Sequence, residues 1–376
     1  MRIYMIGAKG IPAATSQGGG IETHVEELAT RLVVLGHEVS VYVRPYANPR
    51  RIKEFKGVNL ITLPTLKRKN LDAFANSFLA TLHVLGQKAD VVHYHGVGPS
   101  TLAWIPRLFK PRAKIVVTFH SRDRFHEKWR WFAKAYLALG EWTAVFFPHT
   151  TVATSHAIQL FCQRKFKKHV WYIPNGVDIP KKLPGHDELG KFGLQPDGYF
   201  FTLSRFIPHK AIEDAIAAFK SVVTDKRLVV IGFAGPNYIE QRYEKKLRAA
   251  ALGDERIVFS GRQTGETLKQ LIAHSYAMIH PSRSEGLSVS VLEAMSYAKL
   301  VIMSDIPENL ELIDHSGVSY KSGDVGALKQ ALDYVLADPK MTEERGKRAR
   351  DSAIRLFSWD SVVSRTEAVY AALKNI

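Results

Sequence analysis

The sequence predicts an α/β protein made of two Rossmann-like domains, each with a doubly wound parallel sheet. Short apolar strands alternate with amphipathic helices, an order that is typical of parallel strand pairing. The alternation stops at a proline- and glycine-rich stretch over residues 174–196, and then resumes. The length of 376 residues also exceeds one ordinary hydrophobic core and suits two domains.

The first domain is expected over residues 1–178. A strand at Arg2–Ile6 leads through a glycine-rich turn into a helix over 21–35, whose apolar residues recur at helical spacing. Gly36 follows that helix, as is usual at a helix end. The further strands are expected at residues 38–43, 58–63, 90–94, 114–119 and 151–153.

The second domain is expected over residues 179–357, followed by a last helix over 358–376. Its strands are expected at residues 199–203, 228–232, 256–259, 277–280 and 300–304, and its helices at 211–223, 238–251, 264–273 and 289–298. Ligands of open α/β sheets bind beyond the carboxyl ends of the strands. Two such domains facing each other would therefore hold a ligand in a central cleft.

The composition is that of a globular cytoplasmic protein. Apolar residues make up 46% of the chain, and Cys162 is its single cysteine, so no intrachain disulfide can form. The N-terminus lacks the apolar core of a signal peptide, and no later run of about 18 uncharged apolar residues follows. We therefore expect a protein that is neither secreted by that route nor membrane-spanning.

The positive charge is concentrated in the first half of the chain. Residues 1–178 carry 25 Lys+Arg against 11 Asp+Glu, a net of +14, whereas residues 179–376 carry 27 against 25. Aromatic and basic residues also interleave over 122–136. This pattern favours peripheral binding to an anionic membrane surface. Nucleic acid is not expected, because no nucleic-acid-binding motif accompanies the charge, and a merely solvated basic face is the plainer alternative.

Residues 284–295 are the most informative stretch. Two carboxylates, Glu285 and Glu293, lie eight residues apart and flank the start of a predicted helix. Free backbone N–H groups at a helix start attract phosphate, and carboxylates accept hydrogen bonds from sugar hydroxyls. The stretch thus suits a sugar nucleotide. Ser290 and Glu293 also fit a capping box, which is an equally good interpretation of the motif alone.

Arg205 and Lys210 follow the first strand of the second domain and lead into a helix. An arginine fork and a lysine point charge can together hold a diphosphate leaving group. Lone basic residues are usually solvated, but their place beyond the carboxyl end of a strand favours a function.

Gly18, Gly19 and Gly20 open the first helix of the first domain, where the backbone can approach an anionic ligand. The preceding turn reads Gly7-Ala8-Lys9-Gly10 and lacks the dinucleotide fingerprint, so a nicotinamide enzyme is not expected. A flexible glycine loop without a ligand is the alternative.

Three histidines end or follow central strands of the first domain. His93 and His95 are two residues apart and share one face of a strand, where packed histidines are the favoured interpretation. His120 follows residues 114–119 and is the better functional candidate. No cysteine or carboxylate pattern accompanies them, and the chain has no Asp-x-Asp, so no metal is expected.

Together these motifs resemble the retaining glycosyltransferases of the GT-B fold, family 4, also called glycosyl transferase group 1. The resemblance covers nearly the whole chain. It rests on the following residues: Gly19-Gly20-Ile21-Glu22-Thr23-His24-Val25, Gly36-His37-Glu38-Val39, Thr118-Phe119-His120, Ile173-Pro174-Asn175-Gly176-Val177-Asp178, Arg205 with Lys210, and Glu285 with Glu293. Ser288 and Ala211 stand where the family commonly has glycine.

The resemblance implies a role for each candidate residue. Arg205 and Lys210 would bind the donor diphosphate, and Glu293 the ribose. Glu285 would contact the donor sugar, close to the backbone amides of residues 286–288 (Gly286, Leu287 and Ser288). His120 would lie near the anomeric carbon, and the loop at Gly19 and Gly20 near the phosphates or the acceptor. The last helix would cross back to the first domain.

The sequence thus predicts a retaining, metal-independent hexosyltransferase that needs no cofactor. Its donor would be a nucleotide-sugar and its acceptor a glycan or lipid-linked acceptor for cell-envelope polysaccharide biosynthesis. We expect it at the inner face of the cytoplasmic membrane. The alternatives are a sugar-nucleotide epimerase of the same fold, or a non-enzymatic basic module that binds membrane or nucleic acid.

Overall fold

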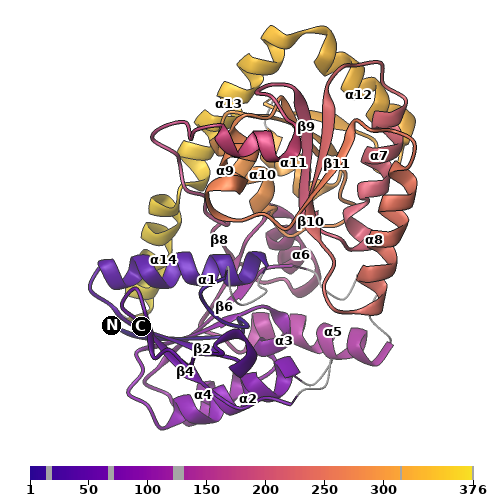
Figure 1. Ribbon diagram of the computed structural model, residues 1–376. Helices are drawn as coiled ribbons and strands as arrows, with labels where there is room; N and C mark the ends of the chain where they lie inside the picture. Colours follow the sequence, from indigo (N-terminus) through magenta and orange to yellow (C-terminus); the bar gives the residue numbers. More distant parts are fainter. Residues whose placement is uncertain (14–18, 67–71, 122–130, 314–315, 375–376) are drawn as a thin grey trace. The chain divides into compact units, whose positions relative to one another are not determined.

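The computed structural model describes residues 1–13, 19–66, 72–121, 131–313 and 316–374. It divides the chain into two compact units (Figure 1). The first unit comprises Met1–Gly176 together with Trp359–Ile376, and the second comprises Val177–Ser358. Both are parallel α/β structures, so the predicted fold class is confirmed.

The first unit is built on an eight-stranded sheet with the order β3-β4-β2-β1-β5-β6-β7-β8. Only the pairing of β3 with β4 is antiparallel. The strands are β1 (Arg2–Ile6), β2 (Glu38–Val43), β3 (Glu54–Phe55), β4 (Val58–Thr62), β5 (Val91–His95), β6 (Lys114–Phe119), β7 (Thr150–Ala153) and β8 (Trp171–Tyr172).

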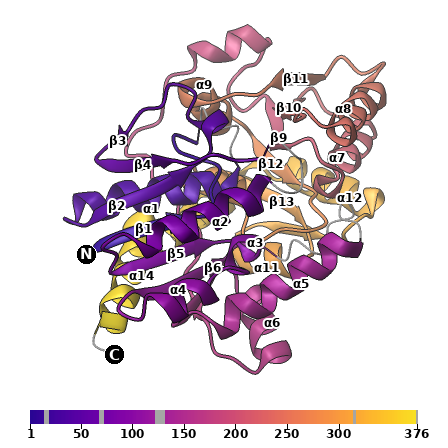
Figure 2. The same cartoon turned by 90° about the horizontal axis from the view of Figure 1, so that it is seen from below.

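Helices cover both faces of the first sheet (Figures 1 and 2). One face carries α1 (Gly20–Val34) and α14 (Trp359–Lys374). The other face carries α2 (Asp72–Leu85), α3 (Val97–Ser100), α4 (Trp104–Phe109), α5 (Trp131–Phe146) and α6 (His156–Phe166). A short 3-10 helix, η1 (Pro45–Ala47), follows β2. Alternate residues of each strand enter the two cores, as the pleat requires.

The second unit has a six-stranded sheet with the order β11-β10-β9-β12-β13-β14, and all of its pairings are parallel. The strands are β9 (Tyr199–Arg205), β10 (Arg227–Phe233), β11 (Ile257–Gly261), β12 (Ala277–His280), β13 (Leu300–Ser304) and β14 (Val318–Tyr320). The order reverses between β9 and β12, and polar loops follow both strands at their carboxyl ends.

The helices of the second unit form two layers around this sheet. One layer consists of α7 (Ile212–Lys220), α8 (Tyr238–Ala251) and α12 (Val325–Ala337). The other consists of α9 (Gly265–Ala273), α10 (Val289–Ser296), α11 (Pro307–Ile313) and α13 (Pro339–Phe357). Two 3-10 helices, η3 (Asp187–Phe192) and η4 (Pro208–Lys210), complete the unit.

The structure differs from the sequence-based prediction in three short strands and in one segment. The strands β3, β8 and β14 have only two or three residues each and carry too short a pattern to be detected. The segment is the proline- and glycine-rich stretch over residues 174–196, at which the alternation of strands and helices stops. Within it, Leu189 and Leu194 are buried in the second core, so residues 187–194 are packed structure.

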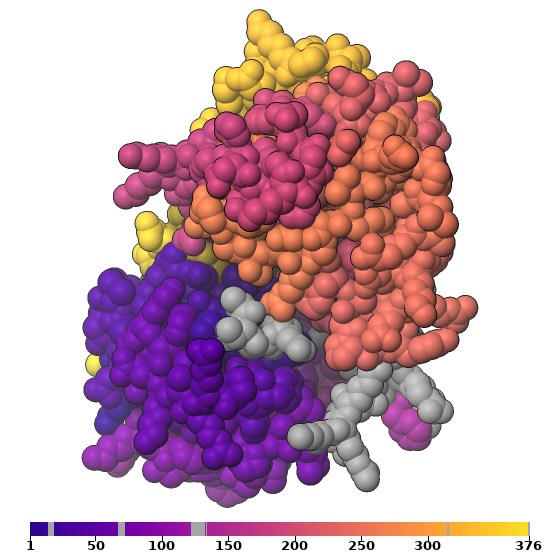
Figure 3. Space-filling view, in the orientation of Figure 1, coloured from indigo at the N-terminus to yellow at the C-terminus, as the bar shows by residue number. Residues whose placement is uncertain are grey.

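The last helix, α14, belongs to the first unit, where Trp359, Val362 and Tyr370 join the core beneath α1. Its yellow atoms lie beside indigo atoms in the space-filling view (Figure 3). The Trp359 ring packs directly on Gly176: a Cβ atom added there would lie 2.3 Å from the ring Cδ2. A glycine is therefore required at this position for steric reasons. No helix in the described part of the chain is long and apolar enough to span a bilayer.

The contact between Gly176 and Trp359 gives a test of how α14 is attached. We expect Gly176→Ala to destabilise the protein by about 1–3 kcal/mol, because the new methyl group displaces the tryptophan ring. Urea unfolding followed by tryptophan fluorescence measures this change. Gly190→Ala is the control, since no atom lies within 4 Å of its added Cβ; equal stability of both variants would contradict the packing.

Candidate functional site

Four candidate residues of the second unit lie in loops or helices that follow β9 and β12. Arg205 is the last residue of β9, and Lys210 ends the short helix η4 that follows. Glu285 lies in the loop after β12, and Glu293 lies inside α10. The strands β9 and β12 are parallel neighbours, so their following loops emerge at the same edge of the sheet.

Lys210 and Glu285 form a nearly buried ion pair. The Lys210 Nζ lies 2.5 Å from the Glu285 Oε1, and the two side chains are 17% and 8% exposed. The His280 Nε2 lies 3.0 Å from the same oxygen. Burial by itself would raise the pKa of Glu285, but Lys210 and His280 outweigh it and hold this pKa well below its usual range. Glu285 is therefore an ionised hydrogen-bond acceptor with fixed geometry.

Arg205 pairs with Glu240, a residue that sequence reasoning missed. The Arg205 Nη2 donates to the Glu240 Oε1 at 2.6 Å, and the backbone N–H of Gly235 donates to Oε2 at 2.6 Å. Burial opposes ionisation of Glu240, yet these bonds lower its pKa overall. The Glu240 carboxylate thus fixes the orientation of the Arg205 guanidinium. Glu240 could have been identified from the sequence, because Asn237 and Glu240 have the spacing of a capping box. In the structure Asn237 does cap α8.

The capping box predicted for Ser290 and Glu293 is wrong. The helix α10 begins at Val289, so Ser288 is its N-cap and Ser290 already lies in the first turn. The Ser290 Oγ is 3.1 Å from the Ser288 Oγ. With no box to form, the Glu293 carboxyl is available for another role. Burial and the nearby Asp178 raise the pKa of Glu293 to about 7.

The residues between the two glutamates contribute mainly backbone. Leu287 is 4% exposed, and its side chain packs in the core of the second unit. Gly286 is half-buried, and Ser288 is buried. The Leu287 side chain therefore anchors this loop to the core.

Ala211, which follows Lys210, has a left-handed backbone with φ 48° and ψ 38°. This conformation explains why glycine is common here in the family that the sequence resembles, because glycine adopts it without strain. This turn joins η4, which ends at Lys210, to α7, which begins at Ile212.

In the first unit, Gly19 and Gly20 begin α1, and Gly18 lies outside the described residues. The Glu22 carboxylate accepts the backbone N–H of Gly19 at 2.6 Å and that of Lys9 at 3.1 Å. Part of the hydrogen-bonding capacity of this helix start is thus used within the protein. Gly20 is exposed at the surface.

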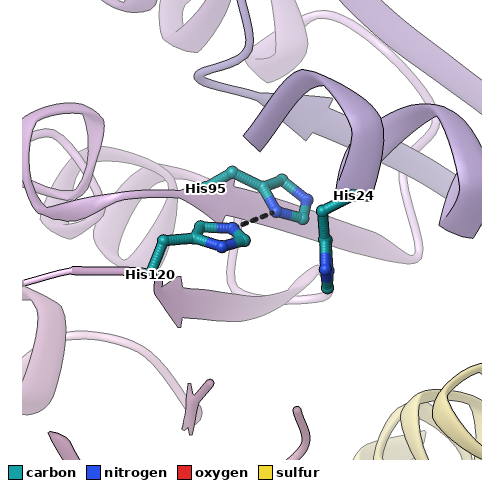
Figure 4. A group of neighbouring side chains, drawn as sticks. All are labelled: His24, His95 and His120. Atoms are coloured by element: carbon teal, nitrogen blue, oxygen red, sulfur yellow. Dashed lines mark hydrogen bonds between the residues drawn. The ribbon is translucent and has the colours of Figure 1, made fainter. Parts of the chain in front are cut away.

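His120 is buried and belongs to a cluster with His24 and His95 (Figure 4). The His95 Nδ1 and the His120 Nε2 lie 3.2 Å apart and share a hydrogen bond. The His24 Nδ1 lies 3.0 Å from the Asn175 Oδ1. Burial and the neighbouring imidazoles His24 and His93 hold the pKa of His120 well below its usual value, so its ring is neutral.

The prediction of a packed histidine is confirmed for His93. Its Nδ1 lies 2.6 Å from the Tyr370 hydroxyl, and its Nε2 lies 2.7 Å from the Thr118 Oγ1. His95 instead faces His120. Sequence reasoning did not single out His24 as a member of this group, because α1 brings it next to strands that lie about 70 and 95 residues further along the chain.

Two family models together match most of the chain. "Glycosyltransferase Family 4" matches residues 18–181, and "Glycosyl transferases group 1" matches residues 190–352. The chain belongs to the GT-B glycosyltransferases. The predicted family is thereby confirmed, and the two matches fall on the first and second structural units respectively.

Known proteins resemble this glycosyltransferase over most of their length. A D-rhamnosyltransferase of Pseudomonas aeruginosa is 28% identical over 300 residues, which cover 76% of this chain and 74% of that protein. A sucrose-phosphate synthase from Thermosynechococcus elongatus has the same fold, with a TM-score of 0.85, 21% identity and 99% coverage of both chains. The Anabaena protein HepE, solved in complex with UDP-glucose, has a TM-score of 0.81 and 18% identity, with coverage of 99% and 100%.

The raised pKa of Glu293 predicts how the stability of the glycosyltransferase depends on pH. The folded state keeps the Glu293 proton up to about pH 7, whereas the unfolded chain releases it near pH 4.5. The stabilisation from this proton is present below pH 4.5 and is lost as the pH rises to 7. Glu293→Gln should therefore be more stable than the unaltered protein at pH 8, by on the order of 2 kcal/mol.

Urea unfolding at pH 5 and pH 8 measures this difference, without nucleotide present. Glu344→Gln, which alters an exposed glutamate of the same unit, should follow the unaltered protein at both values. A Glu293→Gln variant that gains nothing between pH 5 and pH 8 would refute a protonated Glu293 carboxyl in the folded protein.

Proposed function

We propose that the protein transfers a sugar from a nucleotide-sugar donor to an acceptor with retention of anomeric configuration. The observation that carries this proposal is the pairing of Lys210 with the ionised Glu285, at the edge of the sheet where β9 ends with Arg205. Cationic donors for a diphosphate and an anionic acceptor for sugar hydroxyls thus lie in neighbouring loops of one unit. A sugar diphosphate requires both kinds of group.

Each donor contact follows from the chemistry of one residue. Arg205 and Lys210 bind the diphosphate, since both keep free N–H donors beyond their bonds to Glu240 and Glu285. Glu285 and the amides of residues 286–288 contact the sugar and its phosphate, and Glu293 accepts a ribose hydroxyl. The UDP-glucose held by HepE supports a nucleotide-sugar as the donor class.

The catalytic step relies on stabilising the leaving group. Negative charge develops on the departing diphosphate, and Arg205 and Lys210 neutralise it where it forms. The acceptor attacks from the face that the diphosphate leaves, and a phosphate oxygen takes the acceptor proton. No protein base and no metal are then needed. His120 is neutral, so it offers a hydrogen bond to the sugar and adds no charge.

The surface of the first unit supports a lipid-linked or anionic acceptor at the cytoplasmic face of a membrane. Large apolar side chains are exposed on α2, α4 and α5, which lie on one face of the first sheet (Figure 2). The most prominent are Leu82, Leu108, Phe109, Phe132, Leu139 and Trp142. Residues 1–178 also carry a net charge of +14, so the unit that bears this apolar surface is attracted to anionic lipid as well. Such a location fits synthesis of an envelope polysaccharide.

Replacing Lys210 tests the diphosphate role. We expect Lys210→Ala to abolish turnover and to weaken nucleotide-sugar binding, because the leaving diphosphate loses its point charge. Calorimetry with several nucleotide-sugars, chosen by a thermal-shift screen, first identifies the donor. Lys246→Ala is the matched control, since Lys246 forms an exposed pair with Glu213 at 3.2 Å in the same unit.

Three outcomes would contradict the proposed transfer mechanism or favour one of the alternative functions. Near-normal turnover by a folded Lys210→Ala protein would contradict the proposed diphosphate contact. Conversion of the donor to another sugar-nucleotide without any acceptor would identify an epimerase. Salt-sensitive nucleic-acid binding without any donor binding would show a non-enzymatic module.

Vesicle flotation tests the membrane surface. We expect the protein to float with vesicles that contain anionic lipid and to stay in solution with zwitterionic vesicles. Replacing Leu108 and Phe109 by serine should reduce flotation at least several-fold, because both side chains are more than 60% exposed. Leu252→Ser in the second unit, also exposed, is the control. Binding that is indifferent to lipid charge would exclude the electrostatic part of the proposal.

A further inference from the structure

We propose that His24, His95 and His120 form a binding site for one divalent transition-metal ion, such as Zn²⁺. Each histidine offers one ring nitrogen, and the three nitrogens lie within 4.8 Å of one another. The residues come from three different elements: α1, the end of β5 and the residue that follows β6. Figure 4 shows the rings converging from these elements.

The distances between the rings are close to those that a metal requires. Two nitrogens that bind the same tetrahedral Zn²⁺ lie roughly 3.3 Å apart, given metal–nitrogen bonds of about 2.0–2.1 Å. The His95 Nδ1 and the His120 Nε2 are already 3.2 Å apart. The His24 ring stands edge-on to His120 with ring centroids 4.8 Å apart. The three nitrogens lie within 4.8 Å of one another, so the His24 ring has to move closer to complete three ligands, and a water can fill the fourth position.

Each ring must present one lone pair to the metal. The hydrogen bond between the His95 Nδ1 and the His120 Nε2 places a proton on one of these two nitrogens, and that proton must move to the other nitrogen of its own ring when the metal binds. The His24 Nδ1 must donate its proton to the Asn175 Oδ1, since an amide oxygen only accepts. The proton of His24 is then on Nδ1, which leaves the lone pair on Nε2. An amide oxygen behind a histidine ligand is a typical second partner at metal sites.

Incomplete hydrogen bonding distinguishes this cluster from ordinary packed histidines. The His95 Nε2 is buried without a hydrogen-bond partner among the described residues. His93, on the same strand, has partners for both ring nitrogens, Tyr370 and Thr118. The His95 ring is therefore held by one polar contact, with His120, whereas the His93 ring is held by two.

The ligand set selects the class of metal. Only imidazoles converge at this point in the described part of the chain. Neutral imidazole suits Zn²⁺, Co²⁺, Ni²⁺ and Cu²⁺, whereas Mg²⁺ and Ca²⁺ prefer oxygen ligands. We therefore expect the site not to bind Mg²⁺ or Ca²⁺, the cations that commonly accompany diphosphates.

A metal at this site also has a consequence for catalysis, which rests on the proposed function. His120 cannot offer its ring to the donor sugar while it ligates a metal. Zn²⁺ bound at the cluster therefore inhibits sugar transfer, and a chelator restores it. The metal binding itself does not depend on that role of His120.

Cobalt and zinc titrations of the intact protein test the site. We expect one Co²⁺ to bind per chain, with the visible absorption of a four- or five-coordinate ion, and Zn²⁺ to displace it. Because the ion binds the folded state, the melting temperature should rise with its concentration. His24→Gln and His95→Gln should each weaken Zn²⁺ binding by at least about tenfold, as loss of a ligand costs no less than loss of a second partner.

Two control variants locate the site within the molecule. His93→Gln should keep Zn²⁺ binding, because both nitrogens of His93 are engaged elsewhere. His156→Gln removes an exposed histidine of the same unit and should also keep it. Circular dichroism confirms that each variant is folded.

Several results would overturn the site. Absence of saturable one-to-one Co²⁺ binding to the unaltered protein refutes it without any variant. Unchanged affinity of folded His24→Gln and His95→Gln, or an equal loss in His93→Gln, also refutes it. If Zn²⁺ binds at one ion per chain but leaves turnover unaltered, the site stands and the proposed role of His120 falls.

Discussion

Parallel strand pairing is the constraint on which the rest of this structure depends. Every pairing in the second sheet is parallel, as is every pairing in the first sheet except β3 with β4. Parallel neighbours need crossover helices, which cover both faces, and they bring all their carboxyl ends to one edge. Lys210 and Glu285 meet because they follow β9 and β12, which are such neighbours. His95 and His120 meet for the same reason at the ends of β5 and β6.

The two groups of candidate residues are both buried, but one is charged and the other is neutral. In the second unit, Lys210 and His280 keep Glu285 ionised although it is buried, because opposite charges outweigh the cost of desolvation. In the first unit, no described carboxylate joins His24, His95 and His120, so burial leaves them neutral. One group thus presents fixed charges suited to a sugar diphosphate, and the other presents lone pairs and a weak hydrogen-bond donor.

Much of the fold was predictable because strand and helix periodicity is a local property. Strands such as Arg2–Ile6 and Ala277–His280 were predicted with their observed bounds. The short strands β3, β8 and β14 could not be predicted, since two or three residues carry no period. The capping box at Ser290 failed for a related reason: helix starts depend on backbone geometry, and α10 begins two residues earlier than a Ser290 cap requires.

The sequence by itself determined the α/β class, the family and the residue types of the candidate site. Motifs and periodicity are properties of residues that lie close together in the sequence. Only the tertiary structure decided which of those residues touch. It paired Arg205 with Glu240 and Lys210 with Glu285, and it brought His24 from α1 beside His120. These contacts join residues 35 to about 95 positions apart. Sheet order and crossover direction set them, and neither leaves a signal in the local sequence.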